Sequence, residues 1–244
     1  MDETNLPKKL SPSSINTYLQ CPRKFYYTYI LNLPQPYVEA FELGTNVHEI
    51  IHRYYELLPS HSIPSPNEII LFVSKAINDV VGQVTEDLKK RLLGFVEFEK
   101  KRFQVFKWDV KPLYVEKPIE NEFVKGIVDI VFSKNNKPYA IVDWKSGYNV
   151  GVSEDIRLQL SVYKVILGVE KAYVVFLSNP YNGVIEISAL SKEEVQKIVE
   201  NVWSGIRSGK FERKENRYCY ACPYNTICKI STLNSIVRER LLKI

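Results

Sequence analysis

The stretch GIVDIVFSKNNKPYAIVDWKSG, residues 126–147, decides the fold of this 244-residue chain. Its two runs rich in Val, Ile and Phe are typical of β-strands, and the polar segment 133–138 between them indicates a hairpin. Asp129 and Asp143 fall near the ends of the two paired strands, where their side chains can converge on one ion. Lys145 shares a face with Asp143 because side chains alternate along a strand. Two carboxylates and an ammonium suit a divalent-metal site for phosphodiester hydrolysis.

The elements around this hairpin predict an α/β (α+β) fold, in which helices flank a small mixed sheet with β-β-β-α-β-β order. The expected strands are 112–120, 123–132, 139–145, 171–178 and 183–188. The expected helices run from Ser11 to about Cys21, over 44–58, over 67–107 with a break near Gly82 or Gly94, over 153–167, and from the capping box at Ser191 to about Gly209.

The length suits one domain with elaborations, and we expect a single domain over 1–244. It divides into a mainly helical part at 1–110, a core at 111–190, and a C-terminal helix and cysteine segment at 191–244. The composition, 45% hydrophobic and 25% charged, is typical of a soluble globular protein. No apolar run has the length of a membrane span, and the N-terminus lacks a signal peptide, so we expect a cytoplasmic protein.

The four cysteines are spread unevenly: Cys21 lies near the N-terminus, and Cys219, Cys222 and Cys228 form C-x2-C-x5-C. In a reducing cytoplasm they favour metal ligation over disulfides. Three clustered thiolates and a remote one suit a [4Fe–4S] cluster that joins the N- and C-terminal segments, with Zn²⁺ and [2Fe–2S] as alternatives.

Basic residues gather near the C-terminus, where residues 201–244 hold nine Lys/Arg against three Asp/Glu. This balance suits contact with a phosphate backbone, although a solvated tail is the other interpretation. Aromatic and basic side chains also adjoin the cysteines, a mixture that binds single-stranded DNA by stacking and phosphate contacts. The candidate DNA contacts are Arg23, Lys24, Tyr27 and Arg217, and the aromatic residues of this region could equally belong to the core.

Two further motifs accompany the acidic pair. Gln159 and Tyr163, four residues apart, share one face of the helix over 153–167. Gly44-x-x-x-His48 lies on an upstream helix and could supply an imidazole ligand. With these motifs the chain resembles the PD-(D/E)xK nucleases, in the branch that includes the RecB nuclease domain. In size and cysteine layout it is similar to the stand-alone CRISPR-associated RecB-like exonucleases with an iron–sulfur cluster.

The resemblance implies a restriction-endonuclease-like core and a Mg²⁺- or Mn²⁺-dependent DNA exonuclease that acts on single strands or DNA ends. The catalytic residues that it implies are Asp129, Asp143, Lys145, Gln159 and Tyr163. The metal ligands that it implies are His48, Asp129, Asp143 and the main-chain carbonyl of Trp144. Many relatives have Glu where this chain has Asp143. Glu116 could add a further carboxylate, with Glu120 and Glu122 as nearby rivals.

The resemblance also implies a role in CRISPR adaptation and antiviral defence or in DNA repair, with adaptation proteins or a helicase as partners. A catalytically silent DNA-binding adaptor subunit is the alternative from another class. The intact set of Asp129, Asp143 and Lys145 favours the enzyme.

A competing motif occupies the His48 helix, because His48-Glu49-Ile50-Ile51-His52 spells the H-E-x-x-H signature of zinc metalloproteases. The metzincin extension fails, since its glycine and its distal histidine fall on Tyr55 and Leu58. We therefore rank a zinc protease far below a nuclease and expect His52 to be an ordinary residue of the helix.

Overall fold

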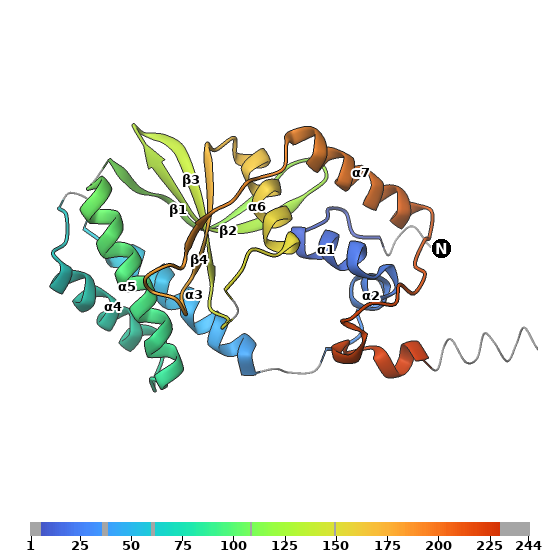
Figure 1. Cartoon of the computed structure of the whole chain (residues 1–244), viewed down its shortest axis with the longest axis horizontal. Helices are drawn as coiled ribbons and strands as arrows, with labels where there is room; N and C mark the ends of the chain where they lie inside the picture. Colours follow the sequence, from blue (N-terminus) through green and yellow to red (C-terminus); the bar gives the residue numbers. More distant parts are fainter. Residues whose placement is uncertain (1–5, 36–38, 60–61, 108, 149, 230–244) are drawn as a thin grey trace, which may run out of the picture. The chain divides into compact units, whose positions relative to one another are not determined.

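The structure is a computed structural model that describes residues 6–35, 39–59, 62–107, 109–148 and 150–229 (Figure 1). Its contacts divide the chain into two compact units. The terminal unit combines Met1–Tyr37 with Gln196–Ile244, and the sheet unit is Val38–Val195. The predicted single domain over 1–244 stays a prediction. Within the described residues, no helix combines the length and the apolar character needed to cross a membrane.

The sheet unit is built on five strands in the spatial order β1-β2-β3-β4-β5. They are β1 (Val110–Glu120), β2 (Lys125–Lys134), β3 (Lys137–Lys145), β4 (Lys171–Phe176) and β5 (Val184–Glu186). Neighbouring strands are antiparallel except β3 and β4, which are parallel and joined through helix α6 (Glu154–Leu167). This mixed sheet with flanking helices confirms the predicted fold class and the β-β-β-α-β-β order.

The β2–β3 hairpin is tighter than the predicted loop over 133–138. Ser133 pairs with Pro138 and Lys134 with Lys137, so only Asn135 and Asn136 form the turn. Both asparagines have positive φ, 52° and 59°. Two consecutive left-handed residues match the twist of the flanking strands, and asparagine tolerates that conformation. The turn chemistry therefore extends both strands into the predicted loop.

Helices α3 (Glu39–Leu57), α4 (Pro66–Val80) and α5 (Glu86–Phe106) lie on one side of the sheet and α6 on the other (Figure 1). The predicted helix over 67–107 breaks beside Gly82, and α5 restarts at Thr85, whose side chain accepts a hydrogen bond from the Leu88 amide at 3.2 Å. Gly94 lies inside α5, where a Cβ would overlap the Leu177 carbonyl. Its role is close packing of the helix on the end of β4.

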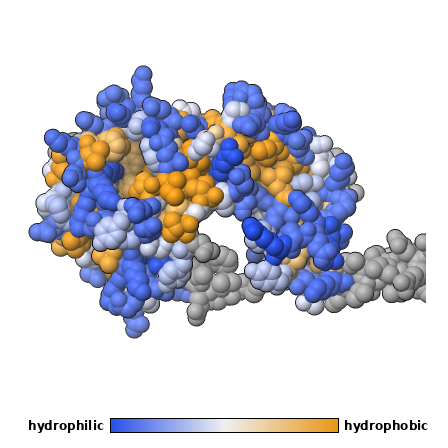
Figure 2. Space-filling model, viewed as in Figure 1, coloured by the Kyte–Doolittle hydropathy of each residue, from blue (hydrophilic) through white to orange (hydrophobic). Residues whose placement is uncertain are grey.

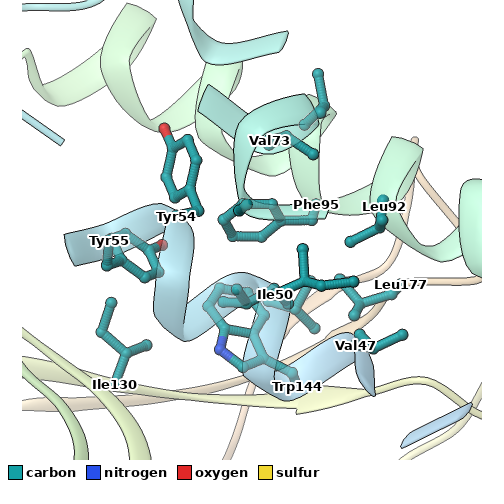
Figure 3. Close-up of a cluster of buried hydrophobic side chains, with 14 of the residues drawn as sticks. Val47, Ile50, Tyr54, Tyr55, Val73, Leu92, Phe95, Ile130, Trp144 and Leu177 are labelled. Atoms are coloured by element: carbon teal, nitrogen blue, oxygen red, sulfur yellow. The ribbon is translucent and has the colours of Figure 1, made fainter. Parts of the chain in front are cut away.

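A cluster of buried aromatic side chains fixes the end of β3 (Figure 3). The indole of Trp144 is 2% exposed and meets Phe95 and Phe98 edge to face, with ring centroids 5.6 and 5.0 Å apart. Edge-to-face pairs of this kind are a favoured aromatic geometry. Because Trp144 is anchored on the α5 side, its neighbours Asp143 and Lys145 are directed to the opposite face of the strand.

A buried hydrogen-bond network around Glu99 ties α3 to α5. Glu99, fully buried, accepts hydrogen bonds from Tyr54 and Tyr55 at 2.9 Å and from Arg102 at 2.7 Å. A buried carboxylate with this many donors is fully compensated, and breaking such a network is costly. The network holds α3, which carries His48, in a fixed position on α5.

The terminal unit brings the first and last described segments of the chain together. Helices α1 (Pro12–Gln20) and α2 (Pro22–Phe25) and the turn η2 (Tyr26–Ile30) come from the N-terminal segment. Helix α7 (Lys192–Arg207) starts in the sheet unit at the predicted Ser191 capping box, and η3 (Cys219–Ala221) follows in the terminal unit. The face of the chain in Figure 2 is mainly hydrophilic, with hydrophobic residues in smaller patches.

Candidate functional site

An open groove in the sheet unit gathers the predicted site residues. It is lined by His48 of α3, Glu116 of β1, Asp129 of β2, Asp143 and Lys145 of β3, and Gln159 of α6. The groove therefore takes a side chain from each of the three antiparallel strands and from helices on both sides of the sheet.

The groove reaches between β2 and β3 because these strands part beside Asp129. Their pairing runs up to Ile130 and Val142 and goes no further toward Asp129. The Trp144 amide instead donates to Asp129 Oδ2 at 2.8 Å, so a side chain replaces the missing main-chain acceptor. The sequence analysis predicted Asp129 near the end of its strand. The structure instead places it in the middle of β2. The opened ladder is what allows its carboxylate to enter the site.

Asp143, Lys145 and Gln159 form a closed set of polar contacts. The Lys145 ammonium lies 2.8 Å from Asp143 Oδ2, and Gln159 Nε2 donates to Asp143 Oδ1 at 2.9 Å. Lys145 Nζ also donates to Gln159 Oε1 at 3.3 Å. Gln159 therefore fixes the carboxylate and the ammonium at once.

His48 connects the acidic residues to the end of β3. Its Nε2 is 3.2 Å from the Trp144 carbonyl oxygen, and its Nδ1 is 3.6 Å from both Glu116 Oε1 and Asp129 Oδ1. Glu116 reaches the group through a backbone with φ 47°. A left-handed non-glycine residue costs about 1–3 kcal/mol and persists where the surroundings require it. Of the three candidate glutamates, Glu116 is the one that joins this group.

Burial and neighbouring charges shift the proton equilibria of Asp129 and His48. Burial, followed by the charge of Asp143, raises the pKa of Asp129 to about 7. Burial lowers the pKa of His48, but its contact with Glu116 and the charges of Asp129 and Asp143 outweigh burial, so the net shift is upward. The contributions of neighbouring carboxylates to both shifts report a concentrated negative potential that favours a bound cation.

Tyr163 supports the site from the same face of α6, one turn after Gln159. Burial raises the pKa of Tyr163 to about 12, so its phenol stays protonated at neutral pH. Its ring lies against Gly126 so closely that a Cβ there would be 2.5 Å from Tyr163 Cε1. The residue therefore packs beside Gln159 and holds a proton, which suits positioning and not proton abstraction.

The donor set fits a hard divalent cation. One ligand atom each from His48, Glu116 and Asp129 lie within 4.8 Å of one another. Asp143 Oδ2 is buried and lies 2.8 Å from the Lys145 ammonium. A carboxylate oxygen has two lone pairs, so it keeps capacity for a ligand bond beside this ion pair. Carboxylate oxygens with one imidazole suit Mg²⁺ or Mn²⁺.

The H-E-x-x-H alternative finds no support in these contacts. His52 also lines the groove, but its Nε2 is 3.8 Å from Glu56 Oε1, one turn further along α3. In the described part of the chain, no group of metal-binding side chains contains both His48 and His52.

The four cysteines line a second hollow, which lies wholly within the terminal unit. None of them forms a disulfide. Burial raises the pKa of the Cys228 thiol, with smaller contributions from Cys21 and Cys222, and Arg213 and Arg23 oppose the shift. The remote Cys21 therefore lies near the C-terminal thiols, as its predicted role requires.

A main-chain amide faces one of the four thiols. The Asn216 amide donates to Cys219 Sγ at 3.4 Å. N–H donors to sulfur are among the groups that tune iron–sulfur clusters.

The four predicted DNA-contact residues differ in the contacts that their side chains make within the terminal unit. Arg23 Nε donates to the Phe211 carbonyl at 2.7 Å, and Tyr27 is 5% exposed and packs on Tyr224. Both serve the packing of the terminal unit. Lys24 Nζ is 3.3 Å from Gln20 Oε1, and the guanidinium of Arg217 lies 4.9 Å from the Tyr218 ring centre. All four assignments stay predictions.

Sequence reasoning missed several residues of the groove. Thr45, Ser146 and Gly147 also line it. Arg91 of α5 is 1% exposed and donates to the Ser146 carbonyl from behind the groove. Ser146 and Gly147 directly follow Lys145, and that adjacency was the available signal. A single arginine on a helix, such as Arg91, gives no such signal in the sequence.

One comparison with known proteins agrees with this geometry. A family model described as the PD-(D/E)XK nuclease superfamily matches residues 9–229. No curated protein matches the chain in sequence. Among solved structures, the "Crystal structure of SSO0001" has 14% sequence identity and a TM-score of 0.43, over 93% of this chain and 89% of that chain.

Proposed function

The chain belongs to the PD-(D/E)XK nuclease superfamily, and we propose that it is a Mg²⁺- or Mn²⁺-dependent deoxyribonuclease that degrades single strands or DNA from its ends. One observation carries the proposal: His48, Glu116 and Asp129 converge within 4.8 Å beside the Asp143–Lys145 pair. A structural ion pair would not need three acidic groups and an imidazole around one point.

His48, Asp129 and Asp143 would hold the cation, together with the Trp144 carbonyl and with Glu116 as a further carboxylate. The bound cation lowers the pKa of water and offsets charge on the phosphate. Lys145, held by Asp143 and Gln159, orients the attacking water or stabilises the negative charge that develops on the phosphoryl oxygens. Gln159 fixes the lysine, and Tyr163 packs behind Gln159.

The test is incubation of the protein with Mn²⁺ or Mg²⁺ and DNA labelled separately at the 5′ and 3′ ends. We expect metal-dependent release of short products from one end, and single strands cut faster than duplex. Products from closed circular DNA would show an endonuclease instead. Tight DNA binding without any cleavage would favour the silent adaptor.

We also propose a [4Fe–4S] cluster bound by Cys21, Cys219, Cys222 and Cys228. The shared hollow and the amide donor to Cys219 support it. The cysteine layout also supports a place among CRISPR-associated nucleases of adaptation, with repair as the other setting, and we expect a cytoplasmic protein in either.

Substitutions of the two histidines of α3 should have clearly different effects on Mn²⁺ binding. His48→Ala is expected to weaken Mn²⁺ binding at least tenfold and to lower cleavage with it, because one ligand is lost. His52→Ala is the matched control on the same helix and groove, and we expect it to stay within about twofold of wild type. Calorimetric Mn²⁺ titration measures both. Equal losses, with stoichiometric zinc, would restore the protease alternative.

Metal affinity should rise with pH. Asp129 has a raised pKa of about 7, so below pH 7 a proton must leave it before the carboxylate can bind a cation. Affinity for Mn²⁺ is therefore expected to increase about eightfold between pH 5.5 and 6.5 and to level off above about 7.5. Titrations across this range in one buffer series check it. A flat profile would contradict the assignment of Asp129 as a ligand.

A further inference from the structure

Arg91 is a buried cation that the proposed chemistry does not use. It lies on α5, is 1% exposed, and donates through Nε to the Ser146 carbonyl. The ring of Tyr148 covers its guanidinium at 4.1 Å, and the Tyr148 hydroxyl is tied to Asp87 of the same helix. No carboxylate among the described residues forms an ion pair with Arg91. A buried charge without a counter-ion is costly, so its position calls for a function.

The contact with Ser146 fixes the orientation of one peptide group. The described chain contains no cis peptide bond, so the carbonyl of Ser146 and the N–H of Gly147 point in opposite directions. Because Arg91 draws the carbonyl toward α5, the Gly147 N–H is turned away from α5. Ser178 Oγ donates to the Gly147 carbonyl at 2.9 Å and holds the next peptide as well.

The Gly147 N–H belongs to a stretch of chain that lines the groove. Ser146 and Gly147 line the groove next to Lys145, and Gly147 is exposed. Within the described part of the chain, the Gly147 N–H has no acceptor. The Gly147 amide is held in place, the Lys145 ammonium lies two residues away in sequence, and the Arg91 guanidinium lies behind the peptide. Together these groups form a binding arrangement for an anion.

We propose that the Ser146–Gly147 peptide binds a phosphate of the substrate strand beside the one that is cut, and that Arg91 is the positioning residue for this contact. The inference rests on the proposed nuclease function. The substrate phosphate also supplies the negative charge that Arg91 lacks in the free protein.

Two substitutions at one position test the amide. Gly147→Pro removes the N–H, whereas Gly147→Ala keeps it, and a Cβ at this residue meets no atom within 4 Å. We expect Gly147→Pro to raise KM for DNA about tenfold with kcat within about twofold, because a charge-assisted hydrogen bond is lost. Gly147→Ala, which keeps the amide, should show a KM about tenfold below that of Gly147→Pro. Arg91→Met should raise KM similarly and leave Mn²⁺ affinity unchanged.

Substrates with a single neutral methylphosphonate linkage give a test that needs no variant to fold. Wild type should show about a tenfold higher KM when the linkage beside the cut is neutral, and Gly147→Pro should be insensitive to it. Equal KM for Gly147→Pro and Gly147→Ala, or no sensitive linkage in wild type, would overturn the inference while cleavage persists. A wild-type protein without metal-dependent cleavage would instead overturn the proposed function.

Discussion

Replacing Asp129, Asp143 or Lys145 by alanine is expected to lower the rate of metal-dependent DNA cleavage by roughly two to three decades or more. Each residue supplies a ligand or a charge at the point where negative charge develops, and loss of one such preorganised group has this effect. Asp129 and Asp143 have 12% and 5% exposed side chains, so water cannot easily replace them. Single-turnover cleavage at saturating Mn²⁺ measures the loss.

The folded state of these variants must be separated from their chemistry. Asp129→Ala also deprives the Trp144 amide of its acceptor, which costs about 1–3 kcal/mol of stability. Asp129→Asn keeps an acceptor oxygen there but loses the negative charge, so it is the cleaner variant. Glu122→Gln is the matched control, because Glu122 is exposed on the same sheet unit and lies outside the metal-binding group. Near wild-type cleavage by folded Asp129→Asn or Lys145→Ala would contradict the site assignment.

Much of the fold could be predicted because its signals are local. The apolar runs of β2 and β3 and the capping residues Ser11 and Ser191 act on their own neighbours, and the structure has these elements near their predicted positions. The errors also have local physical causes. Asn135 and Asn136 make a shorter turn than a count of polar residues suggests, and Gly94 serves close packing where a helix break seemed equally reasonable.

The site could be predicted only where the motif itself carries the chemistry. The contact of Asp143 with Lys145 follows from strand periodicity. The contact of Gln159 with Asp143 joins a helix to a strand, and periodicity could not predict it. Glu116 could not be ranked above Glu120 and Glu122, because its selection depends on a left-handed backbone conformation and on its position opposite the opened β2–β3 ladder. The role of Arg91 could not be predicted from the sequence, since it depends on which loop packs against α5.

The second large effect is expected at the cysteines. The purified protein should be brown, with a broad absorption band near ~400 nm and about four irons per chain, as a cysteine-ligated cubane requires. Cys21→Ala should bleach the protein. Metal analysis and absorption spectra under oxygen exclusion measure both. Lys24→Ala is the matched control, because Lys24 lines the same hollow without offering a sulfur ligand.

Loss of the cluster should also destabilise the terminal unit. A cluster shared by Cys21 and Cys219 closes a loop of nearly the whole chain, and a cross-link of that size stabilises a fold by on the order of 4 kcal/mol. We therefore expect Cys21→Ala to melt roughly 10 °C lower. The direct contacts of Tyr18 with Lys210 and of Arg23 with Phe211 remain in the variant, so the unit should loosen without coming apart.

Mn²⁺ binding separates this structural role from the catalytic one. The ligands around His48 and Asp129 belong to the sheet unit, and the four cysteines belong to the terminal unit, so the two sites share no residue. Cys21→Ala should therefore keep its Mn²⁺ affinity within about twofold while its colour and melting temperature fall. A colourless wild-type protein with one bound zinc ion would show that the cysteines bind zinc and not an iron–sulfur cluster. A Cys21→Ala protein with full colour and stability would show that the fourth ligand lies elsewhere.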